Sequence, residues 1–299
     1  MLKNNKTIKE LLAKNTLPLP ELEIILAFLL KKSREFILLN PNLKITTNLE
    51  KKFNNLVKKR LTGWPMAYLI KEKYFYGYKF IIEEGVLIPR PETESLLDLI
   101  REDLQKIDIC EKDKKINFLD IGTGSGAIII SLAKTMAKKN KTLYKKSCFY
   151  ALDVSSRAIS IANKNIKKHN LIKKIKISKS NLLKNIPQKF WQQEKIILVA
   201  NLPYLTKKQI AQEPSIAKEP KIALNGGYRG ANLYQQLIFS LTNKKFFDLT
   251  LYCEIDPAQA MLLKKFAQKT LKNLDIKIHL KKDLRKKNRF LIIEIRKQS

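Results

Sequence analysis

The segment Asn201-Leu202-Pro203-Tyr204 combines residue types that could prepare a weakly nucleophilic nitrogen for reaction. An amide or exocyclic amino nitrogen reacts poorly because its lone pair is delocalised. Acceptors that bind its N–H hydrogens favour a pyramidal geometry, and the Asn201 side-chain oxygen and the Leu202 carbonyl suit that role. Pro203 stiffens the turn, and Tyr204 offers a flat face for stacking. We interpret residues 201–204 as the reacting corner of an enzyme that methylates a planar amide-type nitrogen by orienting it.

A glycine-rich segment, Gly122-Thr123-Gly124-Ser125-Gly126, lies between a predicted strand and a predicted helix. Alternate glycines allow a sharp turn and let a ligand lie against peptide groups. In an open α/β sheet, ligands bind beyond the carboxyl ends of the strands. A tight structural turn would use the same glycines. The dinucleotide fingerprint would need a glycine at position 127, which is Ala127, so the spacing favours a cofactor without a pyrophosphate.

Asp153 ends the next predicted strand, where a carboxylate can accept two hydrogen bonds from a ribose diol. The alternative is that Asp153 only caps the helix that follows. The chain has 2 histidines and 3 widely spaced cysteines, which give neither a metal-ligand set nor a disulfide framework. We therefore expect an adenosine-containing cofactor and no metal.

The elements that position these residues follow from the apolar pattern. Residues 1–72 have apolar positions at helical spacing, interrupted by prolines, which predicts a small helical bundle. Aromatic and β-branched residues over 74–88 predict a β-hairpin, so 73–88 is expected to link the bundle to a domain over 89–299. In that domain, strands are expected at 116–121, 148–152, 175–177, 196–200, 249–254, 276–280 and 289–295, and helices at 127–138, 158–168 and 258–270. This alternation predicts an α/β fold with a mostly parallel sheet, covered on both faces and ending in an antiparallel hairpin.

Charge and hydropathy set the expected surroundings of the protein. A net charge of +32 would attract a polyanion, which allows proximity to the ribosome or RNA, but the excess is spread evenly and a biased genome composition would also produce it. The longest early apolar run is too short to span a bilayer, and the N-terminus lacks the features of a signal peptide. We expect a cytoplasmic, monomeric protein with no membrane partner.

Further segments complete a pattern that covers nearly the whole chain. They are Gly63-Trp64-Pro65-Met66-Ala67-Tyr68, Phe75-Tyr76-Gly77, Leu87-Ile88-Pro89-Arg90-Pro91-Glu92-Thr93-Glu94, residues 118–128, and Glu219-Pro220 with Ala223-Leu224 and Gly226-Gly227. With these, the chain resembles the HemK/PrmC family, the N5-glutamine methyltransferases that act on the GGQ loop of class 1 peptide-chain release factors. The segment 88–94 is the most specific to the family, although by itself it predicts only a helix start near Glu92 or Thr93.

The resemblance implies a class I S-adenosylmethionine-dependent methyltransferase domain with seven strands, preceded by a helical domain that helps to grip the release factor. It also implies that residues 201–204 hold the substrate glutamine. The residues implied to contact S-adenosyl-L-methionine are Gly122, Thr123, Gly124, Ser125, Gly126, Asp153, Asn181, Leu182 and Asn201.

Three positions depart from the family pattern. The usual Asn-Pro-Pro-Tyr has Leu202 in place of its first proline, which keeps the backbone carbonyl but should make the turn less rigid. Asn181-Leu182 replace an acidic residue and often an aromatic one, so a hydrogen bond to adenine is expected to persist without stacking. Arg229 lies before Gly230, where an acidic residue is common.

Alternative functions remain open at this level. Asn-Leu-Pro-Tyr is also the form found in rRNA adenine dimethyltransferases, but their extra domain follows the catalytic core and they have no counterpart of residues 88–94. A sister enzyme methylates a glutamine of a large-subunit ribosomal protein, and Arg-Pro-Glu-Thr-Glu favours the release-factor branch over it. An inactive RNA-binding module would have lost the glycines or Asn201, and both are intact.

Overall fold

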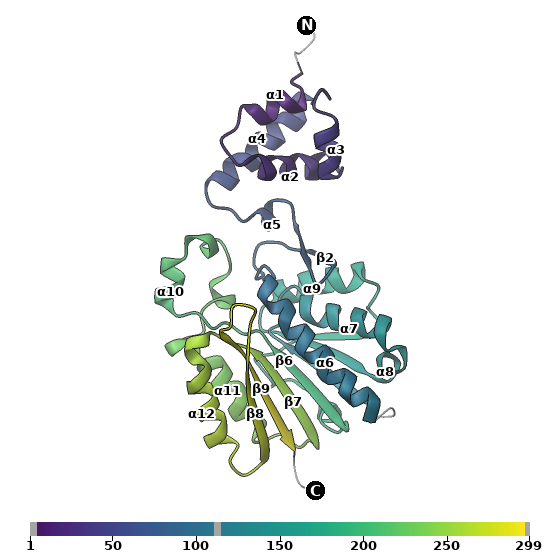
Figure 1. Cartoon of the computed structure of the whole chain (residues 1–299), viewed down its shortest axis with the longest axis vertical. Helices are drawn as coiled ribbons and strands as arrows, with labels where there is room; N and C mark the ends of the chain where they lie inside the picture. The colour runs from purple at the N-terminus through teal and green to yellow at the C-terminus, as the bar shows by residue number, and fades with distance from the viewer. Residues whose placement is uncertain (1–4, 111–114, 297–299) are drawn as a thin grey trace. The chain divides into compact units, whose positions relative to one another are not determined.

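The computed structural model describes residues 5–110 and 115–296 (Figure 1). The chain divides into two compact units. The first comprises Met1–Glu72 together with Glu213–Lys218, and the second comprises Lys73–Gln212 and Glu219–Ser299. In the described ranges, none of the helices combines the length and apolar character that crossing a membrane requires.

The first unit is a small bundle of short helices, as the proline-punctuated apolar pattern predicts. Its helices are α1 (Ile8–Ala13), α2 (Leu19–Leu30), α3 (Arg34–Leu39), α4 (Thr47–Leu61) and α5 (Met66–Leu69). Thr7, Ser33 and Thr46 cap α1, α3 and α4 by accepting a hydrogen bond from the backbone. Their inner faces form one apolar core in which Ile25 and Phe53 are fully buried.

The second unit begins with a hairpin of β1 (Glu72–Phe75) and β2 (Tyr78–Ile81). Tyr76 and Gly77 both have positive φ, 50° and 74°, as a tight two-residue hairpin turn requires. The predicted hairpin was wrong beyond Ile81, because residues 82–88 form no strand. Their apolar side chains gave a strand-like pattern, but Ile82 and Val86 are buried by packing and not by strand pairing.

A seven-stranded mixed sheet forms the centre of the second unit, which confirms the predicted fold class. Its strands are β3 (Ile116–Ile121), β4 (Cys148–Asp153), β5 (Ile175–Lys179), β6 (Lys195–Ala200), β7 (Asp248–Glu254), β8 (Asp275–Lys282) and β9 (Asn288–Arg296). The order across the sheet is β5-β4-β3-β6-β7-β9-β8. The first five strands in sequence are parallel, and β9 pairs antiparallel with both β7 and β8. The order reverses at β3, so the carboxyl ends of β3 and β6 border the crevice where such sheets bind ligands.

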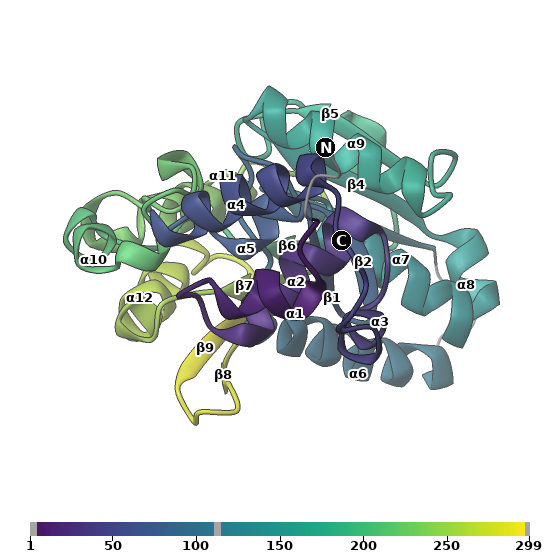
Figure 2. The same ribbon diagram turned by 90° about the horizontal axis from the view of Figure 1, so that it is seen from above.

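Helices cover both faces of this sheet (Figure 1; Figure 2). On one face, α6 (Glu94–Cys110), α7 (Ala127–Lys139) and α9 (Ser156–Lys168) pack side by side. On the other face lie α11 (Asn232–Leu241) and α12 (Ala260–Thr270). Consecutive residues of β7 show the division: the Tyr252 hydroxyl donates to Asp103 of α6, whereas Leu251 packs toward α11. The shorter segments are α8 (Lys141–Lys146), α10 (Lys207–Gln212) and the 3-10 turns η1 (Pro91–Thr93), η2 (Gln188–Phe190), η3 (Pro214–Ile216), η4 (Lys221–Ala223), η5 (Tyr228–Gly230) and η6 (Pro257–Gln259).

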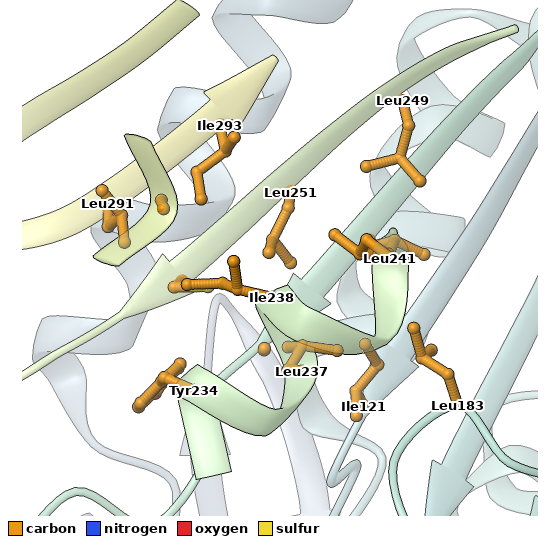
Figure 3. Close-up of a cluster of buried hydrophobic side chains, with 14 of the residues drawn as sticks. Ile121, Leu183, Tyr234, Leu237, Ile238, Leu241, Leu249, Leu251, Leu291 and Ile293 are labelled. Atoms are coloured by element: carbon orange, nitrogen blue, oxygen red, sulfur yellow. The ribbon is translucent and has the colours of Figure 1, made fainter. Parts of the chain in front are cut away.

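The core between the sheet and α11 fixes the strand ends that carry the predicted site. In Figure 3, Leu237, Ile238 and Leu241 of α11 point at side chains from β3, β7 and β9. Leu202, two residues after the end of β6, belongs to the same buried cluster. The turn at 201–204 therefore begins at the end of a strand whose last five residues are buried.

Candidate active site

A cavity of about 550 Å³ opens in the second unit beyond the carboxyl ends of β3, β4, β5 and β6. Most of the predicted site residues line it: Gly122, Gly124, Asp153, Asn181, Leu182, Asn201, Leu202 and Pro203. Parallel strands bring these segments to one edge of the sheet although they lie far apart in the sequence. The lining also includes two stretches without such a prediction, Gly85–Leu87 and the loop around Gly226.

Four predicted residues do not line the cavity. Thr123, Ser125 and Gly126 are the three residues of the glycine loop among them, and Thr123 and Ser125 connect the loop to neighbouring residues. The Thr123 hydroxyl donates to Asp120, at 2.7 Å, and the Ser125 carbonyl accepts from Asn165. Gly126 is the N-cap residue of α7, and the fourth residue, Tyr204, ends the turn outside the cavity lining.

Gly122 and Leu202 approach each other where β3 and β6 end. Gly122 has a φ of 73°, and a Cβ at this position would lie 3.0 Å from Leu202 Cδ2. The Gly122 and Thr123 N–H groups both donate to the Leu152 carbonyl, which joins the loop to β4. A side chain at 122 would therefore be strained and would push against the turn.

Asp153 connects the glycine loop to the start of α9. Its Oδ2 accepts from the Gly124 N–H at 2.9 Å, and its Oδ1 accepts from the Ser155 N–H at 2.8 Å. The helix cap is Ser155, whose side chain accepts from Ala158, so Asp153 is not the N-cap. Burial raises the pKa of Asp153. Each carboxylate oxygen keeps a further lone pair, so Asp153 can also accept from a diol in the cavity.

Asp120, directly before the lining residues of β3, is fully buried. Its Oδ2 accepts from Thr123, but no residue in the described ranges bonds Oδ1. Burial raises the pKa of Asp120 to about 7, and the nearby Asp153 carboxylate adds to the rise. An unpaired buried carboxyl oxygen beside a ligand cavity fits a cofactor that brings a positive charge, because burying a charge is favourable only when it is paired.

Two hydrogen-bond acceptors bind the side-chain nitrogen of Asn201. Its Nδ2 donates to Thr93 Oγ1 of η1 and to Glu254 Oε2 at the end of β7, each at 3.0 Å. Among the described residues, none donates a hydrogen bond to Asn201 Oδ1. Since Asn201 also lines the cavity, its side chain offers an acceptor and no free donor.

The rest of the turn is anchored through its backbone. The Leu202 N–H donates to the Tyr234 hydroxyl at 3.0 Å, and the same hydroxyl lies 3.2 Å from the Leu202 carbonyl oxygen and also contacts the Glu254 carbonyl. A hydroxyl has one hydrogen and a carbonyl has two lone pairs, so the Leu202 carbonyl can accept another hydrogen bond. A Cβ at Gly226 would lie 2.5 Å from the Pro203 carbonyl oxygen, which shows how closely that loop packs on the turn.

Tyr204 points to the same buried carboxylate as Asn201. Its hydroxyl lies 3.4 Å from Glu254 Oε1, and its carbonyl accepts from Gln259 at 2.7 Å. Burial and the neighbouring Glu254 charge raise the pKa of Tyr204 well above its ordinary value. The stacking surface predicted for this ring stays a prediction, since Tyr204 does not line the cavity.

The segment 88–94 supplies the site with more than a helix start. Glu219, whose side chain is buried, accepts from the Ile88 N–H at 3.0 Å and forms an ion pair with Arg90. Thr93 of the same segment bonds Asn201. The sequence reasoning missed the roles of Glu219 and Glu254. The rule that selected Asp153, an acidic residue at the carboxyl end of a buried strand, also describes Glu254 and could have found it.

The structure shows where the remaining departures from the family pattern lie relative to the cavity. Asn181 and Leu182 both line the cavity, and Leu182 has a φ of 50°, a conformation that costs energy for a residue with a Cβ. Arg229, with a φ of 51°, stacks over the exposed Tyr228 ring instead of entering the cavity. Within the described ranges, no three His, Cys, Asp or Glu side chains group as a metal site would require.

Comparison with known proteins covers both units. Residues 6–70 match the family model of the PrmC N-terminal domain, and residues 112–211 match that of a methyltransferase domain. The release factor glutamine methyltransferase of Bacillus cereus is 32% identical over 275 residues, which are 91% of each chain. This chain belongs to the family of release factor glutamine methyltransferases. The family member from Dictyoglomus turgidum is 35% identical over 239 residues, 79% of this chain and 78% of the relative.

One solved structure supports the fold independently. The catalytic domain of human Mettl16, in complex with a MAT2A 3'UTR hairpin, superposes with a TM-score of 0.50. It is 15% identical and covers 92% of this chain and 93% of that one. At this identity the likeness concerns the methyltransferase fold alone.

Proposed function

We propose that this chain transfers a methyl group from S-adenosyl-L-methionine to the side-chain amide nitrogen, N5, of the glutamine in the GGQ loop of class 1 peptide-chain release factors. The observation that carries the proposal is Asn201. Both of its amide hydrogens are used behind the turn, so only its oxygen is offered at the cavity. That polarity is complementary to the N–H groups of a primary amide.

The residues of the cavity divide the work. Gly122 and Gly124 let a ligand approach the backbone, and Asp153 is placed to accept from a ribose diol. The cofactor, when bound, supplies an electrophilic methyl group on a sulfonium. Asn201 Oδ1 and the Leu202 carbonyl would accept the two N–H hydrogens of the glutamine amide and so direct its nitrogen lone pair. The amide nitrogen gains the methyl group and loses one proton to solvent.

The family relationship supports the substrate, and further expectations extend the proposal. We infer that residues 1–72 help to recognise the release factor, and that the chain acts as a monomer in the cytoplasm. The net charge of +32 is compatible with work near the ribosome.

The proposal is tested by offering the purified protein radiolabelled S-adenosylmethionine with a class 1 release factor, ribosomal proteins and naked rRNA in parallel. We expect label on the release factor only, and its loss when the GGQ glutamine of the substrate is changed to alanine. The Asn201→Ala variant should bind cofactor and transfer no label. Label in rRNA alone, or in a ribosomal protein alone, would overturn the proposal.

A further inference from the structure

Asn201 can work as an acceptor only if its amide has the right orientation. The oxygen and nitrogen of an asparagine side chain exchange places when the amide rotates by 180°, at almost no steric cost. A rotated Asn201 would offer a donor to the substrate N–H groups and would repel them. The fold must therefore supply something that distinguishes the two orientations.

Two side chains that contact Asn201 distinguish the two orientations of its amide. Glu254 Oε2 and Thr93 Oγ1 each lie 3.0 Å from Asn201 Nδ2. A carboxylate only accepts hydrogen bonds. The Thr93 hydroxyl can donate or accept, and toward Asn201 Nδ2 it accepts. Its effect on Glu254 is to favour the charged carboxylate and so to lower the pKa of that group. Both groups therefore present lone pairs to Asn201, and a rotated amide would bring Oδ1 against two acceptors.

The surroundings strengthen this discrimination. Glu254 and Thr93 are 1% and 3% exposed, so water does not offer an alternative partner. Solvent screens an electrostatic contact less in such a buried place than at the surface. Glu254 also receives the Tyr204 hydroxyl at 3.4 Å, so one carboxylate binds the first and the last residue of the reacting turn.

We propose that Glu254 and Thr93 are positioning residues for methyl transfer: together they fix the Asn201 amide with its oxygen toward the substrate nitrogen. The inference rests on the proposed function of Asn201 as an acceptor. It also gives the family-specific segment 88–94 a chemical task, because Thr93 reaches the turn from that segment and Glu254 reaches it from β7.

The protonation state of Glu254 belongs to the same arrangement. A protonated Glu254 could donate to a rotated Asn201 Oδ1, and the discrimination would be lost. Burial raises the pKa of Glu254, while the positive charge of Arg289 and the Thr93 and Tyr204 hydroxyls lower it and the charge of Glu92 raises it. The orientation is therefore held above that pKa, and turnover should fall on the acid side of the pH profile.

The kinetic test compares Glu254→Gln, Thr93→Val and Thr93→Ser with the wild-type enzyme. Glu254→Gln keeps the size of the side chain but can donate as well as accept. We expect kcat to fall about 10- to 100-fold, as for a misplaced catalytic hydrogen bond, with the KM for the release factor changed less than about threefold. The acid limb of the kcat profile should disappear in the same variant. Thr93→Val should lower kcat by about tenfold, and Thr93→Ser should restore it.

Tyr252→Phe is the matched control. It removes a buried hydroxyl from the same strand, where it bonds Asp103 at 2.8 Å on α6, without touching Asn201. Its kcat should match that of the wild type. The Kd for S-adenosylhomocysteine, measured by calorimetry, should stay within about twofold in every variant. An unchanged kcat and pH profile in Glu254→Gln would overturn the inference, as would a loss of cofactor affinity that accounts for the loss of turnover.

A measurement without turnover separates this inference from the proposed function. The side-chain amide of Asn201 gives an NMR signal that is assigned by its absence in Asn201→Ala. In the wild type its hydrogens should exchange slowly with water, and in Glu254→Gln and Thr93→Val they should exchange at least about tenfold faster. Slow exchange without release-factor methylation would refute the proposed function alone. Fast exchange in the wild type would refute the positioning role.

Discussion

Asp120 makes the stability of the cofactor-free protein depend on pH. It is fully buried, and burial raises its pKa from an ordinary value of 3.8 to about 7. Between those two values the folded state binds a proton that the unfolded state has released. The free energy of unfolding therefore falls as the pH rises through this range, and the loss is complete above about pH 7.

The size of the effect follows from the two pKa values. One pKa unit corresponds to about 1.4 kcal/mol, so the full difference amounts to roughly 4 kcal/mol, of which about 3 kcal/mol lies between pH 5 and pH 8. Urea unfolding at several pH values measures it, with Asp120→Asn as the comparison. The pKa values of the buried Asp153 and Glu254 are raised as well, so these groups also make the free energy of unfolding fall as the pH rises. The effect of Asp120 is therefore read from the difference in free energy of unfolding between the wild type and Asp120→Asn.

Asp120→Asn carries a constant cost, because its amide would place an unpaired donor where Oδ1 now lies. That cost changes the free energy of unfolding of the variant by the same amount at every pH, so it does not change the slope of the free energy against pH. Part of the expected tilt acts through the Asp153 charge, which raises the pKa of Asp120 and is relieved when Asp120 is neutral. Curves that stay parallel within about 0.5 kcal/mol from pH 5 to pH 8 would refute the reasoning.

Two further changes test the cavity. Asp153→Ala should weaken binding of S-adenosylhomocysteine at least about tenfold, since hydrogen bonds to a charged group contribute about 1.5–3 kcal/mol each; an unaltered Kd in calorimetry would restrict Asp153 to holding Gly124 and Ser155. Leu202→Pro should lower the free energy of unfolding by about 1–3 kcal/mol, because it removes the N–H that bonds Tyr234 and much of a buried side chain, while the turnover of the folded fraction persists. A loss of turnover in protein that remains folded would show that residue 202 has a chemical role beyond its carbonyl.

The central strands of the sheet could be predicted from the sequence because they are short apolar runs that lie in a uniformly buried environment. The run 116–121 and its partners are buried on both faces, so their apolar residues are continuous and their ends are sharp. The glycine loop, Asp153 and Asn201 could be placed together by one rule, that parallel strands end at a common edge. Family resemblance was needed to give the segment 88–94 any weight.

The contacts behind the turn could not be predicted in the same way. Thr93 and Asn201 are 108 positions apart, and no local periodicity indicates that they touch. The same holds for Glu219 and Ile88, 131 positions apart. The pattern over 82–88 even misled, since Ile82 and Val86 are buried by the packing of an irregular segment that resembles a strand in sequence.

Leu202 shows why a family motif can vary at one position and keep its chemistry. Its side chain is 4% exposed and packs on Gly122, and its N–H bonds Tyr234, so both serve the core. In the proposed mechanism only the Leu202 carbonyl takes part in the reaction, and every residue type has a carbonyl. The expected loss of rigidity is also small, because Pro203 already restricts the residue before it to extended conformations. A proline at 202 would stiffen a backbone that is restricted already, and it would remove the bond to Tyr234 that holds this turn in place.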